Sequence, residues 1–567
     1  MKKKFDLKKI SNRLQKIAET QDFEYFSKEM KKYLDAYPEW ADGYALLGHV
    51  LAVLNKTDEA GSAYGKAFSL NQKNIDWKIN ALTCQLATNK FGIKPLEELL
   101  DLFMIHVADL ACATKIAAAM ATAENPKIVI AALKWREQNY PSSPKLTEIL
   151  GRQLIGAGLI AEGCEVYKNL FAQNPDNIIF AEPLASALIS AGSFEACLNI
   201  IEGILQTHPH MRQSLLNEYG LALYALNRSD EAEKVFREYL QAAPSVRAVE
   251  YNLMLALLKS GQYSEGWKFR ELTPDEYKRN NFKNPWLGDS SIYGKTLLVY
   301  WEQGMGDVIQ FIRYVPFLER KGAKVIVSVP QPLERLAQSI SKHVQIVGPD
   351  ESGVAYDVSC SILSLPLALV SQLGGNIPAS IPYLYPEKQN IEESALWLPD
   401  WPGLRVGIVW AGENRPRRGY NYRSRSINLN GFRPIIEVPG ACFINLQFGQ
   451  RREELKNWAG PEIFDPMDHV EDMEDTAAII AHLDLVITVD TSVAHLAGAM
   501  GKPVWMLTRS DCCWRWQENR DDSPWYPTMR IFRSQPGSLS HAVNLAAAVL
   551  PKFIAEHAGQ KQFSEVE

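Results

Sequence analysis

The sequence predicts an array of helical repeats over residues 1–280, followed by two α/β lobes with a substrate cleft between them. Three observations predict this fold class. One helical pattern recurs in the first half, with prolines spaced by about one repeat. After residue 290, short apolar runs alternate with helical segments. A proline-rich stretch then divides the second half into lobes over 290–395 and 396–567, the latter ending in a helix.

The helical half repeats a pattern of small and large residues. Gly48 and Ala60 are followed by Tyr64, and a later copy places Gly220 and Ala232 before Phe236. A proline follows the second helix of three copies, at positions 175, 209 and 244. This pattern resembles the tetratricopeptide repeat, in which small residues lie where two helices cross and large ones fill the space between repeats. The resemblance implies a groove that holds a peptide or a partner protein.

The repeat count stays open, because residues 75–140 are degenerate and residues 251–267 form a divergent last copy. We expect the array to fold and bind its partner without the second half.

The second half alternates apolar strands with helices. Its strand-like runs include "KTLLVYW" and "AKVIVSV" in the first lobe and "LRVGIVWAG", "LDLVITVDT" and "PVWMLT" in the second. Continuous apolar strands are typical of parallel sheets covered on both faces. The sequence therefore predicts two Rossmann-like lobes, with ligands bound at the carboxyl ends of the strands.

Composition excludes several classes of protein. The net charge of −6 implies no general affinity for nucleic acid. No apolar run is long enough to span a membrane, and the basic start lacks the apolar segment of a secretory signal. The eight cysteines lack zinc-binding spacing. We expect a cytoplasmic protein in a reducing compartment, without a structural metal.

The stretch "VDTSVAHL" joins a strand to a helix. Asp490 ends the strand, Thr491 and Ser492 start the helix, and His495 lies one turn further. The first N–H groups of a helix are unpaired and attract anions, so this stretch predicts a phosphate site. A charge-assisted hydrogen bond from His495 would strengthen it. The alternative is that Asp490 or Thr491 caps the helix and His495 belongs to the core.

A second loop, "YWEQGMGDVIQF", follows the first strand of the first lobe. Gly304 and Gly306 allow a tight turn, and Asp307 opens the next helix. From the residues alone, this carboxylate suits a helix cap.

Two lobes with these two loops resemble the heptosyltransferase-type glycosyltransferases of family nine, which have the GT-B fold. The stretch "DTAAIIAHLDLVITVDTSVAHLAGAMGKPVW", followed by "DCCWRW" and "DSPWYPTMRIFR", resembles bacterial repeat-containing glycosyltransferases that modify flagellin. In the family, the aspartate at the position of Asp307 is the general base on the acceptor hydroxyl. The resemblance therefore implies that Asp307 is the base, and we count Gly306 of the same loop among the donor-binding residues.

An arginine-rich loop precedes the next strand of the second lobe. Its five arginines are Arg415, Arg417, Arg418, Arg423 and Arg425. Guanidinium groups are always charged and bind phosphate or carboxylate in a bidentate way, although a solvated loop is the alternative. We favour Arg425, because the family has a similar "RS" before its next strand.

Further polar and aromatic residues stand at strand ends and helix starts. Gln447 ends a strand, and Asp475 and Thr476 start a helix; they could bind the nucleotide or the sugar, or serve as caps. Four aromatic residues could line the sugar pocket or pack the end of the lobe, and packing is favoured for Trp525. They are Trp514, Trp516, Trp525 and Tyr526.

Together these features predict an inverting, metal-independent glycosyltransferase with a nucleotide-sugar as co-substrate and no other cofactor. A helix N-terminus and arginines would stabilise charge in place of a metal. The acceptor is a protein held by the repeats. The resemblance implies flagellin as that protein and a CMP-linked nonulosonic acid such as pseudaminic acid as the donor, while UDP- and GDP-sugars stay open. The alternatives are a transferase acting on lipopolysaccharide or polysaccharide, and a non-catalytic repeat adaptor.

Overall fold

The computed structural model forms two compact units, residues 1–191 and 192–567. It describes residues 22–88, 90–123, 125–173, 175, 178–272, 282–349, 353–401, 403–412, 425–535 and 538–564, with the backbone alone at 178, 272 and 558–564. Within these ranges, no helix combines the length and apolar character needed to cross a membrane.

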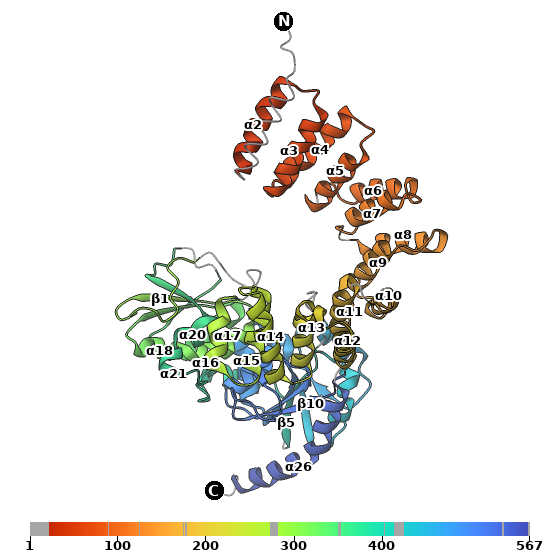
Figure 1. Ribbon diagram of the computed structural model, residues 1–567. Helices are drawn as coiled ribbons and strands as arrows, with labels where there is room; N and C mark the ends of the chain where they lie inside the picture. Colours follow the sequence, from red (N-terminus) through yellow and green to blue (C-terminus); the bar gives the residue numbers. More distant parts are fainter. Residues whose placement is uncertain are drawn as a thin grey trace. The chain divides into compact units, whose positions relative to one another are not determined.

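The first unit consists of helices joined by short turns (Figure 1). They are α2 (Phe23–Ala36), α3 (Ala41–Val53), α4 (Thr57–Leu70), α5 (Ile75–Thr88), α6 (Lys94–Ile105), α7 (Leu110–Met120), α8 (Pro126–Asn139), α9 (Pro144–Gly156), α10 (Ile160–Gln173) and α11 (Ile178–Ala191).

Glycine allows close crossing of the paired helices in this unit. A Cβ on Gly48 would lie 3.0 Å from the ring of Tyr64, and one on Gly151 would lie 3.0 Å from the ring of Tyr167. The small residues expected at the helix crossings are therefore confirmed, and the large rings, which were expected between repeats, lie at these same crossings against the paired helix. The second helix α10 ends just before Pro175, since proline cannot continue a helix.

The second unit begins with helices of the same pattern. They are α12 (Phe194–Thr207), α13 (Arg212–Ala225), α14 (Ser229–Ala242), α15 (Arg247–Lys259), α16 (Tyr263–Gly266) and the 3₁₀ helix η2 (Trp267–Leu272). A Cβ on Gly220 would lie 2.4 Å from the ring of Phe236, so α13 and α14 cross as closely as the pairs of the first unit. The boundary expected near residue 280 lies outside the described residues.

The first lobe is built on a parallel four-stranded sheet in the order β3-β2-β1-β4. Its strands are β1 (Thr296–Tyr300), β2 (Lys324–Ser328), β3 (Gln345–Val347) and β4 (Val358–Ser361). Its α-helices are α17 (Met305–Phe311), α18 (Val315–Arg320), α19 (Glu334–Ala337), α20 (Leu365–Ala368) and α21 (Val370–Leu373), and α22 (Lys388–Ala395) follows in the connection to the second lobe.

The second lobe contains a parallel six-stranded sheet in the order β10-β9-β8-β5-β6-β7. Its strands are β5 (Leu404–Val409), β6 (Ala441–Asn445), β7 (Ile463–Phe464), β8 (Leu485–Val489), β9 (Val504–Arg509) and β10 (Met529–Ser534). Its α-helices are α23 (Arg433–Ile436), α24 (Met473–Ala481), α25 (Ser492–Ala499) and α26 (Ser540–Ser564).

Burial on both faces explains the continuous apolar strands. All five side chains of β8 are buried, and residues of β5, β8 and β9 share one core with α26. The predicted fold class, helical repeats followed by two parallel-sheet lobes, is therefore confirmed.

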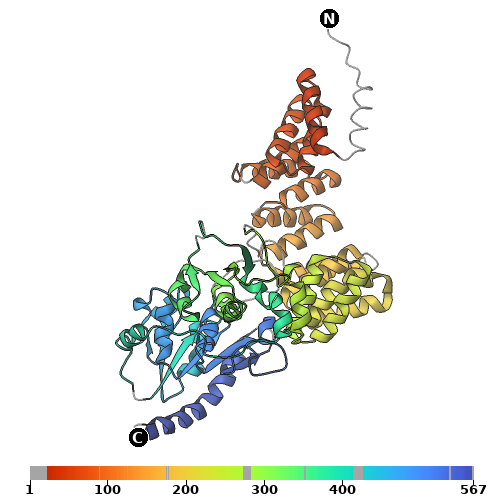
Figure 2. The same cartoon turned by 90° about the vertical axis from the view of Figure 1, so that its left-hand side faces the viewer.

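The helices of residues 194–272 also pack against the lobes of the same unit (Figures 1 and 2). Helix α15 contacts the loop around Trp514, and η2 contacts α20 of the first lobe. This packing weakens the expectation that the repeats fold without the second half. A chain ending at residue 285 would lose these contacts and expose the side chains that make them.

Candidate functional site

The two sheets place the predicted site residues at comparable positions. In the second sheet, the chain leaves the adjacent strands β5 and β8 in opposite directions, and in the first sheet β4 returns beside β1, on the side away from β2. Ligands of open α/β sheets bind in the crevice outside such a switch point. The turn to Asp307 follows β1, and Asp490 follows β8, so each lobe contributes one predicted residue from a switch-point strand.

Helix α25 begins at Ser492 with an accessible first turn. Thr491 occupies the N-cap position, but its side chain makes no capping hydrogen bond and instead contacts the hydroxyl of Thr488 at 3.0 Å. Among the described residues, no hydrogen-bond partner engages the hydroxyl of Ser492 or the backbone N–H groups of Ser492 and Val493. These groups remain available to an anion.

His495 lies one turn along α25 and is 5% exposed. Its Nδ1 is 2.9 Å from the hydroxyl of Tyr526, and its ring stacks on Trp516 at a centroid distance of 5.1 Å. Burial lowers the pKa of His495 to about 4, although Asp490 acts in the opposite direction. The ring is therefore neutral at pH 7, which corrects the expectation of a charge-assisted hydrogen bond: in this structure, a bond from His495 is a neutral one.

Asp490 is a charged group near the start of α25. Burial raises the pKa of its carboxyl, but Arg425, His495 and Arg515 outweigh burial and leave the pKa below its usual value. One oxygen of Asp490 lies 3.4 Å from Nη1 of Arg425, whose side chain is 53% exposed. The structure thus places Arg425 beside the predicted phosphate site. The other four arginines of that loop lie outside the described residues.

Asp307 has partners at both carboxylate oxygens. The backbone N–H of Gly304 donates to Oδ2 at 2.9 Å, as a helix cap requires. Nη2 of Arg515 donates to Oδ1, while Nε of Arg515 donates to Gln310 at 2.8 Å. The cap alternative is therefore present in the structure, and the role of general base stays a prediction.

Arg515 is the residue that sequence reasoning missed. Burial lowers its pKa, but Asp307, Cys513 and Asp490 outweigh burial and raise the pKa above the usual value. Its side chain is 14% exposed and bridges the two lobes. The motif "DCCWRW" contains it, but the neighbouring tryptophans drew attention instead. Only the fold brings position 515 against position 307.

Gly306 brings the two helix starts into contact. A Cβ at this position would lie 2.9 Å from Cδ2 of His495 and 3.6 Å from the Cα of Ser492. A side chain here would push the lobes apart, so glycine permits α17 and α25 to approach. The structure thus groups Gly306, Asp307 and His495, with Arg515 between the lobes.

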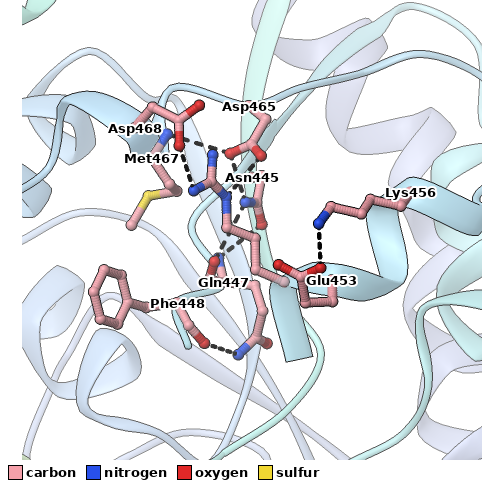
Figure 3. Close-up of polar contacts among 9 residues, drawn as sticks. Asn445, Gln447, Phe448, Glu453, Lys456, Asp465, Met467 and Asp468 are labelled. Carbon is pink, nitrogen blue, oxygen red and sulfur yellow. Dashed lines mark hydrogen bonds and ion pairs between the residues drawn. The ribbon is translucent and has the colours of Figure 1, made fainter. Parts of the chain in front are cut away.

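Gln447 is held by the protein at the carboxyl end of β6. Its Oε1 accepts from the backbone N–H of Ala411 at 2.8 Å, and its Nε2 donates to the carbonyl of Phe448 at 3.0 Å. Figure 3 shows this region, where Asn445 donates to Asp465 at 2.8 Å and to the carbonyl of Gln447. The exposed ring of Phe448 is a further candidate for contacting a ligand at this edge.

Asp475 and Thr476 lie in the first turns of α24, which Asp472 caps. Asp475 accepts from the N–H of Glu471 at 2.9 Å and pairs at 3.1 Å with Arg335 of the first lobe. The hydroxyl of Thr476 donates to the carbonyl of Asp472 at 3.1 Å. In this structure both residues serve helix and lobe contacts, and their binding of a nucleotide stays a prediction.

The four aromatic residues expected at the pocket or in packing are all buried in this structure; they are Trp514, Trp516, Trp525 and Tyr526. Trp516 and Tyr526 contact His495, so their packing also shapes the site. Within the described part of the chain, no group of three or more His, Cys, Asp or Glu residues could hold a metal ion.

Residues 471–535 match the model of glycosyltransferase family 9 (heptosyltransferase). This segment includes α24, α25 and the loop that carries Arg515. Residues 41–74 and 214–246 match the tetratricopeptide repeat. The matches support a glycosyltransferase domain joined to tetratricopeptide repeats.

The chain is also similar to Protein FlbA of Caulobacter vibrioides, at 25% identity over 429 residues, which are 70% of this chain and 70% of that protein. Among solved structures, it is similar to a family 9 glycosyl transferase from Veillonella parvula (10% identity, 47% of this chain, 98% of that chain, TM-score 0.35). A tetratricopeptide repeat protein from Parabacteroides merdae matches with 15% identity, 44% of this chain, 98% of that chain and a TM-score of 0.34.

Proposed function

We propose that this chain is an inverting glycosyltransferase that moves a sugar from a nucleotide-sugar to a Ser or Thr hydroxyl of a protein held by its repeats. The observation that carries the proposal is the meeting of the two switch-point loops. Gly306 lies against His495, and Asp307 pairs with Arg515 across the lobes. The match of residues 471–535 to family 9 supports the same reaction class.

The donor phosphate binds at the start of α25 in this proposal. The N–H groups of Ser492 and Val493 and the hydroxyl of Ser492 face it, and Arg425 adds positive charge. Neutral His495 binds the donor phosphate through Nε2. Within the described residues, its Nδ1 contacts Tyr526 and its Nε2 makes no hydrogen bond. The positive side chains take the part that a metal has in other transferases.

Arg515 connects donor binding with Asp307. Without a donor, its guanidinium pairs with the carboxylate of Asp307. A donor phosphate competes for the guanidinium, which frees Oδ1 of Asp307 to accept the proton of the acceptor hydroxyl as the sugar is transferred. Asp307 thus takes up the role of base only when the donor is bound.

The first compounds to test follow from the resemblance. They are CMP-linked nonulosonic acids such as pseudaminic acid, with UDP- and GDP-sugars beside them, and flagellin is the first acceptor. We place the reaction in the cytoplasm. The purified chain is incubated with each pair, and the acceptor's intact mass is measured.

The expected result is a mass gain of one or more sugar residues on the acceptor with the wild-type chain and a much smaller gain with Asp307→Asn. A sugar found on lipopolysaccharide or polysaccharide instead of a protein would change the acceptor class. No transfer and no nucleotide binding with any donor would leave the adaptor alternative.

A further inference from the structure

The last repeat helices hold both loops that meet at the Asp307–Arg515 pair. We propose that Ser229 and Arg270, on these helices, are positioning residues that set the geometry of this pair. The inference rests on the proposed function and adds to it that part of the repeat array belongs to the catalytic unit.

Arg270 holds the loop that leads to Asp307. Its Nη2 donates to Oε2 of Glu302 at 2.5 Å, and the hydroxyl of Ser361 donates to the same oxygen at 2.6 Å. The two charged side chains are 5% and 2% exposed. The next residue, Gln303, has a φ of 63°, which a non-glycine residue keeps only where its surroundings hold it.

Ser229 holds the loop that carries Arg515. Its hydroxyl donates to Oε2 of Glu518 at 2.6 Å, three residues after Arg515, and Ser229 is fully buried. Gln517 has a φ of 49°, so this loop is also in a conformation that needs support. A Cβ on Gly261 would lie 2.7 Å from Nε2 of Gln517, which shows how closely α15 and the loop approach.

Trp267 of η2 contacts both loops at once. Its ring centroid is 5.4 Å from that of Trp514, the residue before Arg515. It is 6.0 Å from that of Phe311, the last residue of α17, which has Asp307 in its first turn. The same short stretch of the repeat array therefore packs against the two segments that carry the partners of the ion pair.

We attribute to these contacts the positioning of the two loops, and not a gain in the stability of the fold. A buried Arg–Glu pair contributes little net stability compared with apolar residues of the same size, because both charges lose their hydration. It does fix the position of the groups that it joins. A shift of about 1 Å in a reacting group can lower the rate by about a hundredfold, so contacts that hold both loops bear directly on transfer.

Hydrogen exchange in the full-length chain tests the inference without any substrate. The variant Ser229→Ala removes the hydrogen bond from the hydroxyl and leaves the longer one, at 3.4 Å, from the backbone N–H of Ser229 to Glu518. The variant Glu518→Ala removes both from the loop side. The matched control is Glu231→Ala, on the same helix, which pairs with the exposed Arg228. The readout is the exchange rate of backbone amides in residues 304–311 and 511–519.

Either test variant is expected to raise exchange by about tenfold in both segments, and the control is expected to raise it in neither. A rise confined to the start of α14 would overturn the inference, because Glu518 would then be only a local cap. Glu518→Gln keeps an oxygen that accepts from Ser229 and should restore protection. If Ser229→Ala fails to fold, Glu518→Ala decides the question.

Kinetics provide the second readout. With the donor identified by the transfer assay, Ser229→Ala should lower kcat by about tenfold or more and leave the donor KM within about twofold, because Ser229 touches no part of the donor site. An unchanged kcat would overturn the inference. A wild-type chain without transferase activity would instead contradict the proposed function, and the exchange result would still show whether the helices hold the loops.

Discussion

The helices of residues 22–191 and those of residues 194–272 follow one sequence pattern, but one ion pair from each set shows that their side chains can have very different surroundings. In the first set, Lys134 and Glu162 form an ion pair at 2.6 Å with side chains 44% and 51% exposed. In the second set, the pair of Arg270 with Glu302 is almost fully buried. Exposed pairs contribute little stability, whereas a buried pair fixes geometry. The comparison indicates that repeats of one pattern can serve either as an array or as part of the lobes' core.

Among the tests of this comparison, truncation is expected to change thermal stability the most. A chain of residues 192–567 keeps every contact of the second unit and should unfold cooperatively. A chain of residues 286–567 removes Arg270 from buried Glu302, and breaking a buried pair costs about 3–5 kcal/mol. Thermal unfolding followed by circular dichroism checks this. Equal midpoints for the two fragments would show that the second set of helices is as separable as the first.

Replacing the carboxylate of Asp307 tests the ion pair that these helices hold. Asp307→Asn keeps an oxygen for the N–H of Gly304 but removes the charge, so we expect turnover to fall about 10²–10⁴-fold. Donor affinity should be kept or raised, because the charge that competes for Arg515 is gone. The matched control is Asp289→Asn, an exposed aspartate of the same lobe. Full turnover in Asp307→Asn would leave this residue as a helix cap.

The neutral state of His495 predicts a pH dependence of stability. The ring's ordinary pKa is 6.5, and burial lowers it to about 4 in the folded chain. The unfolded chain therefore binds the proton more readily between these values. The resulting stability is present above pH 6.5 and is lost as the pH falls toward 4, by about 3 kcal/mol.

Denaturant unfolding at several pH values, compared between wild type and His495→Gln, measures the contribution of His495 to the free energy of unfolding. The variant should show a weaker decline between pH 6.5 and 4. Parallel curves would mean that His495 is not buried in its neutral form.

Because the lobes approach closely at Gly306, replacing this glycine is expected to have a moderate effect on stability and nucleotide binding. In Gly306→Ala the new Cβ would meet His495 at 2.9 Å, so either the ring or the lobe must shift. Overpacking of this kind costs about 1–3 kcal/mol. Nucleotide binding measured by calorimetry should weaken, while Gly304→Ala, in the same turn, serves as the comparison. Unchanged affinity would separate Gly306 from the donor site.

The smallest effect is expected at the exposed pair of the first set. Lys134→Ala should change the free energy of unfolding by less than about 1 kcal/mol, because solvent screens the pair. Equilibrium denaturation checks this value. A loss as large as that from breaking the pair of Arg270 with Glu302 would remove the contrast between the two sets of helices.

Much of the fold could be predicted from local pattern. Helical repeats leave a period that can be counted, and buried parallel strands leave continuous apolar runs, so both halves are confirmed. The positions of Asp307 and Asp490 at strand ends could be inferred for the same reason. Arg515 could not, because its importance depends on a contact between residues 208 positions apart in the chain.

The sequence by itself determined the helical repeats, the two parallel sheets and the residue types at the strand ends, because these depend on periodicity and neighbouring residues. Only the tertiary structure decided that His495 is neutral, that Arg515 faces Asp307, and that the helices of residues 194–272 hold both loops. Burial, charge pairing and close packing depend on which distant segments meet. Local pattern contains no measure of those distances.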